Sequence, residues 1–210
     1  MKIVTILGSP RKDSNSSMIA ERFNQTAKQA GAEVRTYSLH KIRFLGCQAC
    51  QKCKQGPEGE CVLRDDLTEV LNNVHTADIL VIATPVYYGD VNHWVGAFLE
   101  RTYSYLRPDF MSNPKPCRLP PGKKLVFIQV QGAAEGLYTD IFRRYGVFFR
   151  FDGFDELHLI RSCDTNDPGQ IATRPDILSQ AEDLARRLCV PTGQEQKQRD
   201  RPQRKVTGET

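Results

Sequence analysis

The sequence predicts an α/β fold in which a doubly wound, five-stranded parallel sheet lies between two layers of helices. Three nearly continuous apolar runs indicate strands that are covered on both faces: 2–7 (KIVTIL), 78–84 (DILVIAT) and 124–130 (KLVFIQV). Two weaker runs, 33–39 (EVRTYSL) and 156–161 (ELHLIR), complete the set. Five strands that alternate with helices favour right-handed crossovers and the strand order 2-1-3-4-5 over the longer dinucleotide-binding order.

Apolar residues that repeat every three or four positions indicate the helices. They occur at Ile19, Phe23, Ala27 and Ala30, at Leu67, Val70, Leu71 and Val74, and at Ile177, Ala181, Leu184 and Leu188. Asp65 and Asp66 precede the second of these stripes, where capping of the helix is a better interpretation than an acid pair. The sequence therefore predicts three amphipathic helices from these stripes.

One domain accounts for most of the chain. Residues 1–190 hold the predicted elements together with a cysteine-rich insertion at 46–63, and the polar tail 191–210 has little to bury, so we expect it to be disordered. The composition is that of a soluble protein, with 26% charged residues and no apolar run of membrane-spanning length. The apolar start before Gly8 is too short for a signal peptide, which predicts a cytoplasmic protein. The net charge of +4 forms no basic stripe, so no nucleic-acid partner is expected.

The loop GSPRKDSNSS, residues 8–17, follows the first strand. Ligands of doubly wound sheets bind beyond the carboxyl ends of the strands, which makes this loop a candidate site. It lacks the G-x-G-x-x-G of a dinucleotide site and instead offers hydroxyls, an amide and Arg11 at the start of a helix, a combination that favours a terminal phosphate. The alternative is that these residues only cap the helix and form the turn.

Two further loops lie at the same edge of the predicted sheet. In PVYYGD (85–90), a proline that ends a buried strand, two aromatics and a glycine can place a flat surface beside a flat ligand. The alternative is a strand end followed by two core tyrosines. In QGAAEG (131–136), Gln131 and Gly132 follow the fourth strand, where small residues would let the backbone come close to a ligand. A plain strand-to-helix turn explains this loop almost as well.

The first loop resembles that of the flavodoxin-like NAD(P)H-dependent FMN reductase family, which has G-S-x-R followed by an Asn-Ser/Thr pair. The stretch TPVYYG also resembles this family, in which such a loop borders the ribityl chain and the isoalloxazine ring. The resemblance implies a flavodoxin-like fold, FMN as cofactor and NAD(P)H as electron donor. It assigns FMN binding to Ser9, Arg11, Asn15, Ser16 and Ser17, and to Pro85, Val86, Tyr87, Tyr88 and Gly89. Gln131 and Gly132 join this predicted site because small residues there would let the backbone reach the pyrimidine edge of a flavin.

Four of the seven cysteines fall within fifteen residues, at Cys47, Cys50, Cys53 and Cys61. The spacing C-x2-C-x2-C-x7-C lets thiolates converge on one centre, and the glycines and proline of KQGPEGE allow the chain to turn back with the fourth. This run is typical of a [4Fe–4S] cluster, whereas a zinc knot usually pairs two separate C-x2-C units and disulfides are unusual in the cytosol. Zinc binding and cysteines without a ligand stay open as alternatives.

The position and spacing of these cysteines resemble the iron–sulfur flavoproteins, homodimeric or homotetrameric relatives of the FMN reductases. The resemblance covers residues 1–165 and implies that the four thiols hold a cluster near FMN. The flavin then carries the chemistry without a catalytic side chain, and electrons pass to a small molecule or a ferredoxin-like protein. The helix after TPVYYG departs from the family pattern, with Gly96 and Glu100-Arg101 in place of a Lys and an Asp-Arg, which puts the contacts of that helix in question.

Two other functions stay open. One is a cluster-free NAD(P)H-dependent flavin or quinone reductase, in which the cysteines form a loop or bind zinc. The other is a metal-binding sensor or interaction module, for which the basic tail is the supporting feature. A visible spectrum of anaerobically purified protein, with iron and sulfide assays, separates these readings.

Overall fold

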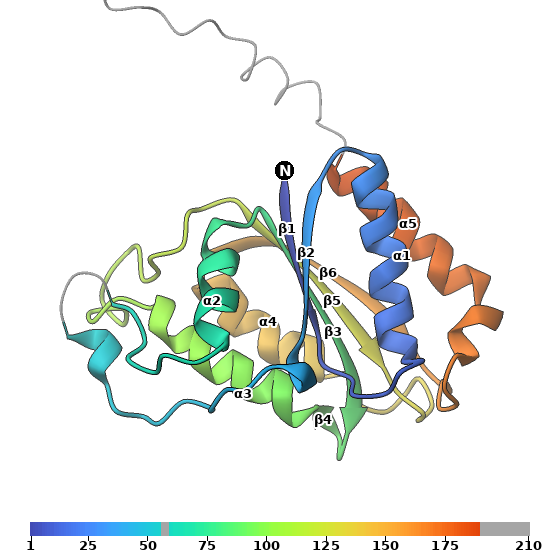
Figure 1. The fold of residues 1–210 in the computed structure, drawn as a ribbon, viewed down its shortest axis with the longest axis horizontal. Coiled ribbons are helices and arrows are strands. Elements are labelled where there is room, and N and C mark those ends of the chain that lie inside the picture. Colours follow the sequence, from blue (N-terminus) through green and yellow to red (C-terminus); the bar gives the residue numbers. More distant parts are fainter. Residues whose placement is uncertain (56–58, 190–210) are drawn as a thin grey trace, which may run out of the picture.

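A six-stranded sheet forms the centre of the computed structural model, which describes residues 1–55 and 59–189 (Figure 1). Its strands are β1 (Lys2–Leu7), β2 (Glu33–Ser38), β3 (Ile79–Tyr87), β4 (Asp90–Val91), β5 (Lys123–Val130) and β6 (Phe154–Ser162). Five of them pair in parallel in the order β2-β1-β3-β5-β6, and β4 pairs antiparallel with the end of β3. The predicted order is confirmed, because β5 and β6 are the predicted fourth and fifth strands, and β4 is an addition.

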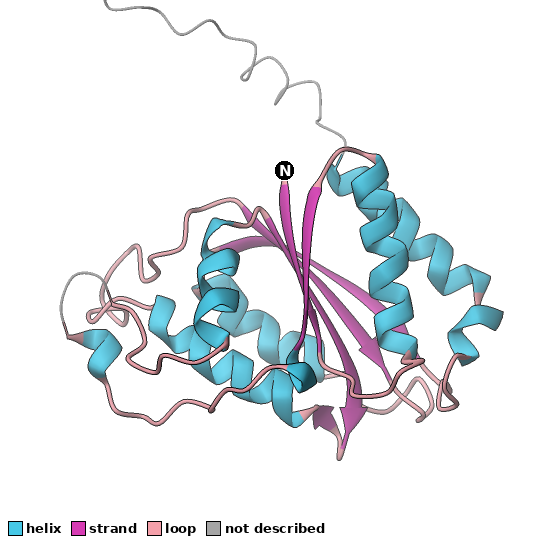
Figure 2. Ribbon diagram, in the orientation of Figure 1, coloured by secondary structure: helices cyan, strands magenta, loops and turns pink. Residues whose placement is uncertain are grey.

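Helices cover both faces of the sheet (Figure 2). In Figure 1, α1 and α5 lie on one face, and α2, α3 and α4 lie on the other. The five α-helices of the described residues are α1 (Asn15–Gln29), α2 (Leu67–Thr76), α3 (His93–Arg101), α4 (Ile141–Phe151) and α5 (Pro175–Cys189). Short 3-10 turns are η1 (Leu39–Lys41), η2 (Lys52–Lys54), η3 (Thr102–Tyr105) and η4 (Gln170–Thr173). The three-layer α/β/α architecture is thus confirmed.

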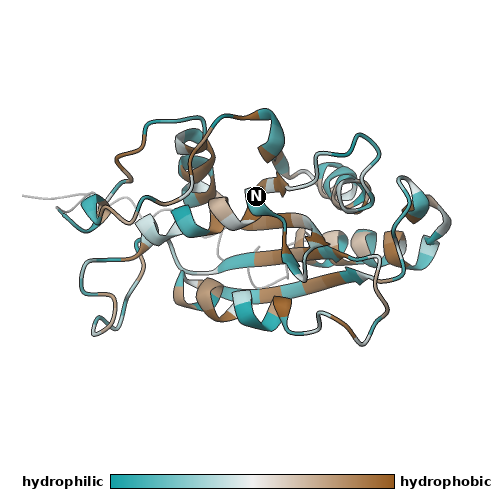
Figure 3. Ribbon diagram, turned by 90° about the horizontal axis from the view of Figure 1, so that it is seen from below, coloured by the Kyte–Doolittle hydropathy of each residue, from teal (hydrophilic) through white to brown (hydrophobic). Residues whose placement is uncertain are grey.

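Successive side chains of the central strands point to opposite faces and divide the core in two. Ile3 and Val81 pack against α1 and α5 with Phe23, whereas Val4 and Ile82 pack on the α2–α4 side. These side chains are buried, as period-two alternation on a doubly covered sheet requires. In Figure 3, brown residues lie along much of the strands, and the helices carry both brown and teal residues. None of the helices within the described ranges is long and apolar enough to cross a bilayer.

The ends of the helices differ from the prediction at two points. Ala30 follows the end of α1 and is exposed, so it does not extend the buried stripe. Asp66 precedes α2, but its side chain makes no capping bond and instead accepts from the backbone N–H of Arg43 at 2.8 Å. Asp65 pairs with Arg101 at 2.8 Å. The side chain of Asp66 therefore does not cap α2, although Asp66 occupies the N-cap position, and the carboxylate of Asp65 is bound to a donor that is distant in sequence.

The segment after the third strand is a hairpin rather than a loop. β3 continues through Pro85, which lies opposite Val130 of β5, so the proline does not end the strand. Proline is tolerated there because the position is close to the end of the ladder. Tyr88 and Gly89 have φ values of 51° and 79°, the positive pair that a type I′ turn needs. The turn places the side chain of Tyr88 in solvent.

Candidate functional site

A small recess lies at the carboxyl ends of β1, β3 and β5, beside the first turn of α1. Its volume of about 60 Å³ is far below the roughly 300–1,000 Å³ of pockets that enclose a drug-sized ligand, so it suits a phosphate-sized group and not a flavin ring. The lining comprises Ser9, Arg11, Asp13, Ser14, Asn15, Ser16, Pro85, Val86, Tyr87, Val130, Gly132, Thr165, Asn166 and Pro168. Eight predicted residues therefore meet there, whereas Ser17, Tyr88, Gly89 and Gln131 lie outside the lining.

Serine hydroxyls gather at the start of α1. Ser14 is the N-cap, and its Oγ accepts from the backbone N–H of Ser17 at 3.4 Å and lies 3.0 Å from the Oγ of Ser16. The side chain of Ser9 accepts from the N–H of Arg11 at 3.3 Å and shapes the turn before the helix. Because the first N–H groups of a helix have no partner within it and carry partial positive charge, this corner favours an anion.

Capping and phosphate binding are both compatible with this arrangement, but the residues divide between them. Ser17 contributes its backbone N–H to the cap, which fits the structural alternative. Ser16 is 1% exposed and lines the recess, and its Oγ lies 3.0 Å from that of Ser14. Arg11 supplies the positive charge of the lining, against one carboxylate from Asp13.

Asn15 holds the recess together. Its Nδ2 donates to the carbonyl oxygen of Asp167 at 2.8 Å, and its Oδ1 accepts from the N–H of Ile171 at 3.0 Å. Both ends of this buried amide are therefore bound to the segment after β6. Arg11 reaches the same segment through Nη1, which donates to the carbonyl oxygen of Asn166 at 2.9 Å. The structure thus gives Asn15 the role of positioning this wall of the recess.

The sequence prediction missed this wall, which is formed by Thr165, Asn166 and Pro168. The stretch DTNDPG follows the last strand and is a turn signal at the carboxyl edge of the sheet, so a search of every strand end could have found it.

Gln131 lies beside the recess and organises the loop after β5. Its Nε2 donates to the carbonyl oxygens of Ala133 at 3.2 Å, Ala134 at 3.0 Å and Leu137 at 2.9 Å, while its Oε1 accepts from Gln129 at 2.8 Å. A side chain so fully engaged within the protein offers little to a ligand. Gly132, in contrast, lines the recess.

A second and larger cavity of about 540 Å³ lies between the cysteine segment and helices α3 and α4. All four clustered cysteines line it, together with aromatic side chains that include Tyr103, Tyr145 and Phe149. Cys47 and Cys50 are exposed, and Cys53 and Cys61 are half-buried. The chain between them is strained, because Ala49 and Gln51 have φ values of 50° and 58°. Left-handed backbone at these two residues turns the segment between the first three cysteines.

The thiols lie within electrostatic reach of one another. Burial raises the pKa of Cys53, Lys54 lowers it, and the negative forms of Cys61, Cys47 and Cys50 raise it again. Within residues 1–55 and 59–189, no three His, Cys, Asp or Glu side chains come close enough to hold a single metal ion. A [4Fe–4S] cluster does not need its thiolates to meet at one ion, because each thiolate binds a separate iron at a corner of the cluster. Four thiols around one roomy cavity fit that donor set.

The two sites occupy loops that match a known family. The family model of NADPH-dependent FMN reductases matches residues 1–138, which include the serine-rich turn, the Tyr88-Gly89 hairpin and the whole cysteine segment. The chain belongs to the NADPH-dependent FMN reductase family. The resemblance inferred from the two loops is confirmed.

Curated relatives of this FMN reductase family member include several iron-sulfur flavoproteins. One from Methanocaldococcus jannaschii is 34% identical over 136 residues, which cover 65% of this chain and 64% of that protein. One from Archaeoglobus fulgidus is 35% identical over 105 residues, which cover 50% of this chain and 47% of that protein. The matched part spans about half the length of the first of these relatives.

Solved structures of flavin-dependent reductases share the fold. An FMN-dependent NADH-azoreductase from Bacillus anthracis, in complex with FMN, has a TM-score of 0.69 at 18% identity over 90% of this chain and 99% of that one. An NAD(P)H:quinone oxidoreductase from Methanothermobacter marburgensis has a TM-score of 0.66 at 17% identity over 91% and 98% of the two chains. At this identity the likeness establishes the fold, which confirms the flavodoxin-like class for this FMN reductase family member.

Proposed function

We propose that this protein is an FMN-dependent oxidoreductase of the iron–sulfur flavoprotein type that takes electrons from NAD(P)H. The observation that carries the proposal is that the chain holds two sites. The small recess beside the first turn of α1, which we call the anion recess, lies at the carboxyl edge of the sheet, and the four-thiol cavity lies against α3. When bound, FMN would supply two-electron chemistry and a [4Fe–4S] cluster one-electron transfer.

The residues of the recess support binding of a terminal phosphate. Ser14, Ser16 and the free N–H groups of the first turn of α1 surround the space, and Arg11 adds a charge-assisted donor. Tyr87 borders the recess on the side of the hairpin, and Tyr88 stands exposed at its tip, where an aromatic surface beside a flavin ring is expected. The azoreductase of Bacillus anthracis, which shares this fold, was solved with FMN.

The cysteine cavity supports a cluster at Cys47, Cys50, Cys53 and Cys61. The four thiols come from one segment and line one space, and two curated relatives that match 50% and 65% of this chain are iron-sulfur flavoproteins. The aromatic and apolar side chains of α3 and α4 would exclude water from the inner side of the cluster and so tune its potential.

Anaerobic purification of the full chain tests both parts. We expect FMN to be released on denaturation and about four iron atoms per chain, with matching sulfide. Addition of NADH or NADPH under argon should bleach the flavin absorbance. Protein that binds no FMN, even with the cofactor in excess, would overturn the oxidoreductase assignment.

A cluster-free NAD(P)H-dependent flavin or quinone reductase is the second candidate. The exposure of Cys47 and Cys50 favours it, because thiols that are open to solvent do not require a bound metal. In that case the protein binds FMN and oxidises NAD(P)H but carries no iron after anaerobic purification or reconstitution. The sensor-module alternative drew on the tail 191–210, which lies outside the described residues.

Self-association is part of the proposal. Val147 and Phe148 on α4 are each 64% exposed, and Phe151 is 39% exposed, which is an unusual amount of apolar surface for one short helix. A second copy of the chain that packs on α4 would bury these side chains. Light scattering at two concentrations is expected to give a dimer or tetramer, and Phe148→Glu should shift it toward the monomer.

A further inference from the structure

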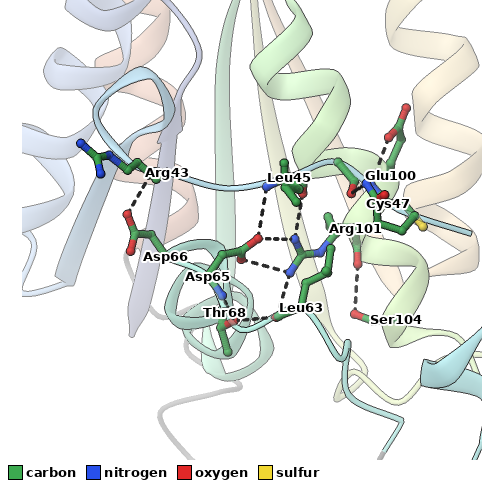
Figure 4. Close-up of polar contacts among 12 residues, drawn as sticks. Arg43, Leu45, Cys47, Leu63, Asp65, Asp66, Thr68, Glu100, Arg101 and Ser104 are labelled. Carbon is green, nitrogen blue, oxygen red and sulfur yellow. Dashed lines mark hydrogen bonds and ion pairs between the residues drawn. The ribbon is translucent and has the colours of Figure 1, made fainter. Parts of the chain in front are cut away.

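The two ends of the cysteine segment meet at one side chain of α3. The guanidinium of Arg101 donates through Nη1 to the carbonyl oxygen of Leu45 at 2.8 Å and through Nη2 to the carbonyl oxygen of Leu63 at 3.3 Å (Figure 4). Leu45 lies two residues before Cys47, and Leu63 lies two residues after Cys61. The guanidinium of Arg101 therefore holds both ends of the segment that carries the four cysteines (the quartet), and we call this contact the clamp.

Asp65 completes this contact. Its two carboxylate oxygens accept from Nη1 and Nη2 of Arg101 at 2.8 Å and 3.2 Å, and its Oδ2 also accepts from the N–H of Leu45 at 3.2 Å. The fork-to-fork geometry is the strong form of an Arg–carboxylate pair. The side chain of Arg101 is fully buried and that of Asp65 is 17% exposed, so solvent screens the pair little.

A neighbouring residue of α3 also binds the backbone of the first cysteine. Glu100 Oε2 accepts from the backbone N–H of Cys47 at 3.3 Å (Figure 4). A Cβ at Gly46 would lie 2.9 Å from that carboxylate oxygen, which is the flexible end of the Glu100 side chain. Burial lowers the pKa of Arg101, but Asp65 and Cys61 outweigh this effect and raise it.

We propose that Arg101 is a positioning residue that ties Leu45 to Leu63 and so closes the segment between them into a loop whose four cysteines face one cavity. The inference deepens the proposed function. Closure of the loop by Arg101 does not depend on that function, whereas the identity of the group that the thiols bind rests on it. Closing a loop costs chain entropy, and a buried bidentate ion pair with two backbone acceptors offsets that cost. Lysine cannot replace it, since one ammonium cannot present two parallel donors to a carboxylate and reach both carbonyls.

Two measurements on the full chain test the closure. Trypsin cleavage after Lys52 reports an open loop without any metal, and loss of iron to a chelator after anaerobic reconstitution with iron and sulfide reports how well the thiols converge. For Arg101→Met we expect faster cleavage after Lys52 and iron affinity about 10–100-fold weaker, as for the loss of a residue that orients metal ligands. Arg101→Lys should fall between the wild type and Arg101→Met.

Lys123→Met is the matched control. Lys123 is another buried cation, and its Nζ donates to the carbonyl oxygens of Val74 at 3.1 Å, His75 at 2.9 Å and Ala77, away from the cysteine segment. Its loss should lower the melting temperature while cleavage after Lys52 and iron affinity stay at the wild-type values. A second variant, Arg101→Met with Asp65→Asn, avoids an unpaired buried carboxylate.

The outcomes are distinct. If a folded Arg101 variant shows wild-type cleavage and wild-type iron affinity, the clamp is overturned. If all Arg101 variants fail to fold, the residue serves the stability of the domain as a whole, and a role confined to the loop is likewise overturned. If the wild type takes up no iron while Arg101→Met still opens the loop, the cluster proposal fails and the clamp stands.

Discussion

The side chain of Asn92 is hydrogen-bonded to Gly8 and joins the loop after β1 to the start of α3. Its Nδ2 donates to the carbonyl oxygen of Gly8, and its Oδ1 caps α3 by accepting from the N–H of Val95 at 3.1 Å. The N–H of Asn92 donates to Thr84 Oγ1 at 3.2 Å. A Cβ at Gly8 would lie 2.5 Å from Val95 Cγ2, so only glycine permits this approach. One buried residue thus connects three elements beside the anion recess.

Asn92→Ala is expected to destabilise the protein by about 1–3 kcal/mol, because it removes a helix cap and leaves the buried carbonyl oxygen of Gly8 without its donor. FMN affinity should fall with it, since the turn that begins at Gly8 loses its anchor. Urea unfolding and quenching of FMN fluorescence measure the two effects. Asn72→Ala, at an exposed position of α2, is the control and should change neither.

Ser16→Ala separates phosphate recognition from capping. The hydroxyl of Ser16 lines the recess but does not cap α1, because Ser14 does. Loss of a hydrogen bond to a charged phosphate should weaken FMN binding about 10–100-fold, whereas riboflavin, which has no phosphate, should bind as before. Titrations of both flavins measure this difference. An equal loss for riboflavin would show that Ser16 only supports the fold; Ser179→Ala, exposed on α5, is the control.

Cys50→Ser tests whether the two sites are separate. Cys50 lines the larger cavity and no part of the anion recess, so the variant should lose most of its iron and keep its FMN. Cys163→Ser changes a cysteine outside the quartet and should keep both. Iron assays and flavin release on the same preparations provide the measurement. Loss of FMN together with iron from Cys50→Ser would contradict the assignment of two independent sites.

Asp152 predicts a pH dependence of stability. Its side chain is buried beside the cysteine cavity, where burial raises its pKa to about 7, although Thr102 and Lys54 act to lower it. The folded pKa lies above the unfolded one, so the folded state binds the extra proton and its stabilisation is lost as the pH rises through about 7. We expect a loss of about 2 kcal/mol between pH 5.5 and pH 8.

Asp152→Asn should remove this slope, which urea unfolding at the two pH values can measure. Tyr105 and Cys117 also face Asp152, but the pKa of Cys117 is raised by burial to about 11, so this thiol does not titrate in the window. An unchanged slope in Asp152→Asn would assign the pH dependence to another group.

The five parallel strands and their order follow from the sequence because each of these strands carries its own signal, whereas the short β4 does not. An apolar run such as 78–84 indicates a strand covered on both faces, and three such runs with two weaker ones, alternating with helices, leave few topologies. The pattern does not indicate α4, because Val147, Phe148 and Phe151 are exposed and blur its buried stripe. Apolar periodicity therefore does not predict a helix whose exposed face also carries apolar residues.

The sequence by itself determined the fold and singled out the serine-rich turn and the cysteine run, because each of these is local in the chain, whereas it did not reveal the wall of the recess after β6. Only the tertiary structure decided which of these residues face a cavity and which hold the walls in place. Asn15 binds Asp167, and Arg101 binds Asp65, across separations of 152 and 36 residues. Hydrogen bonds and ion pairs between such distant groups form only after the sheet and its helices have packed, and so no local pattern in the chain encodes them.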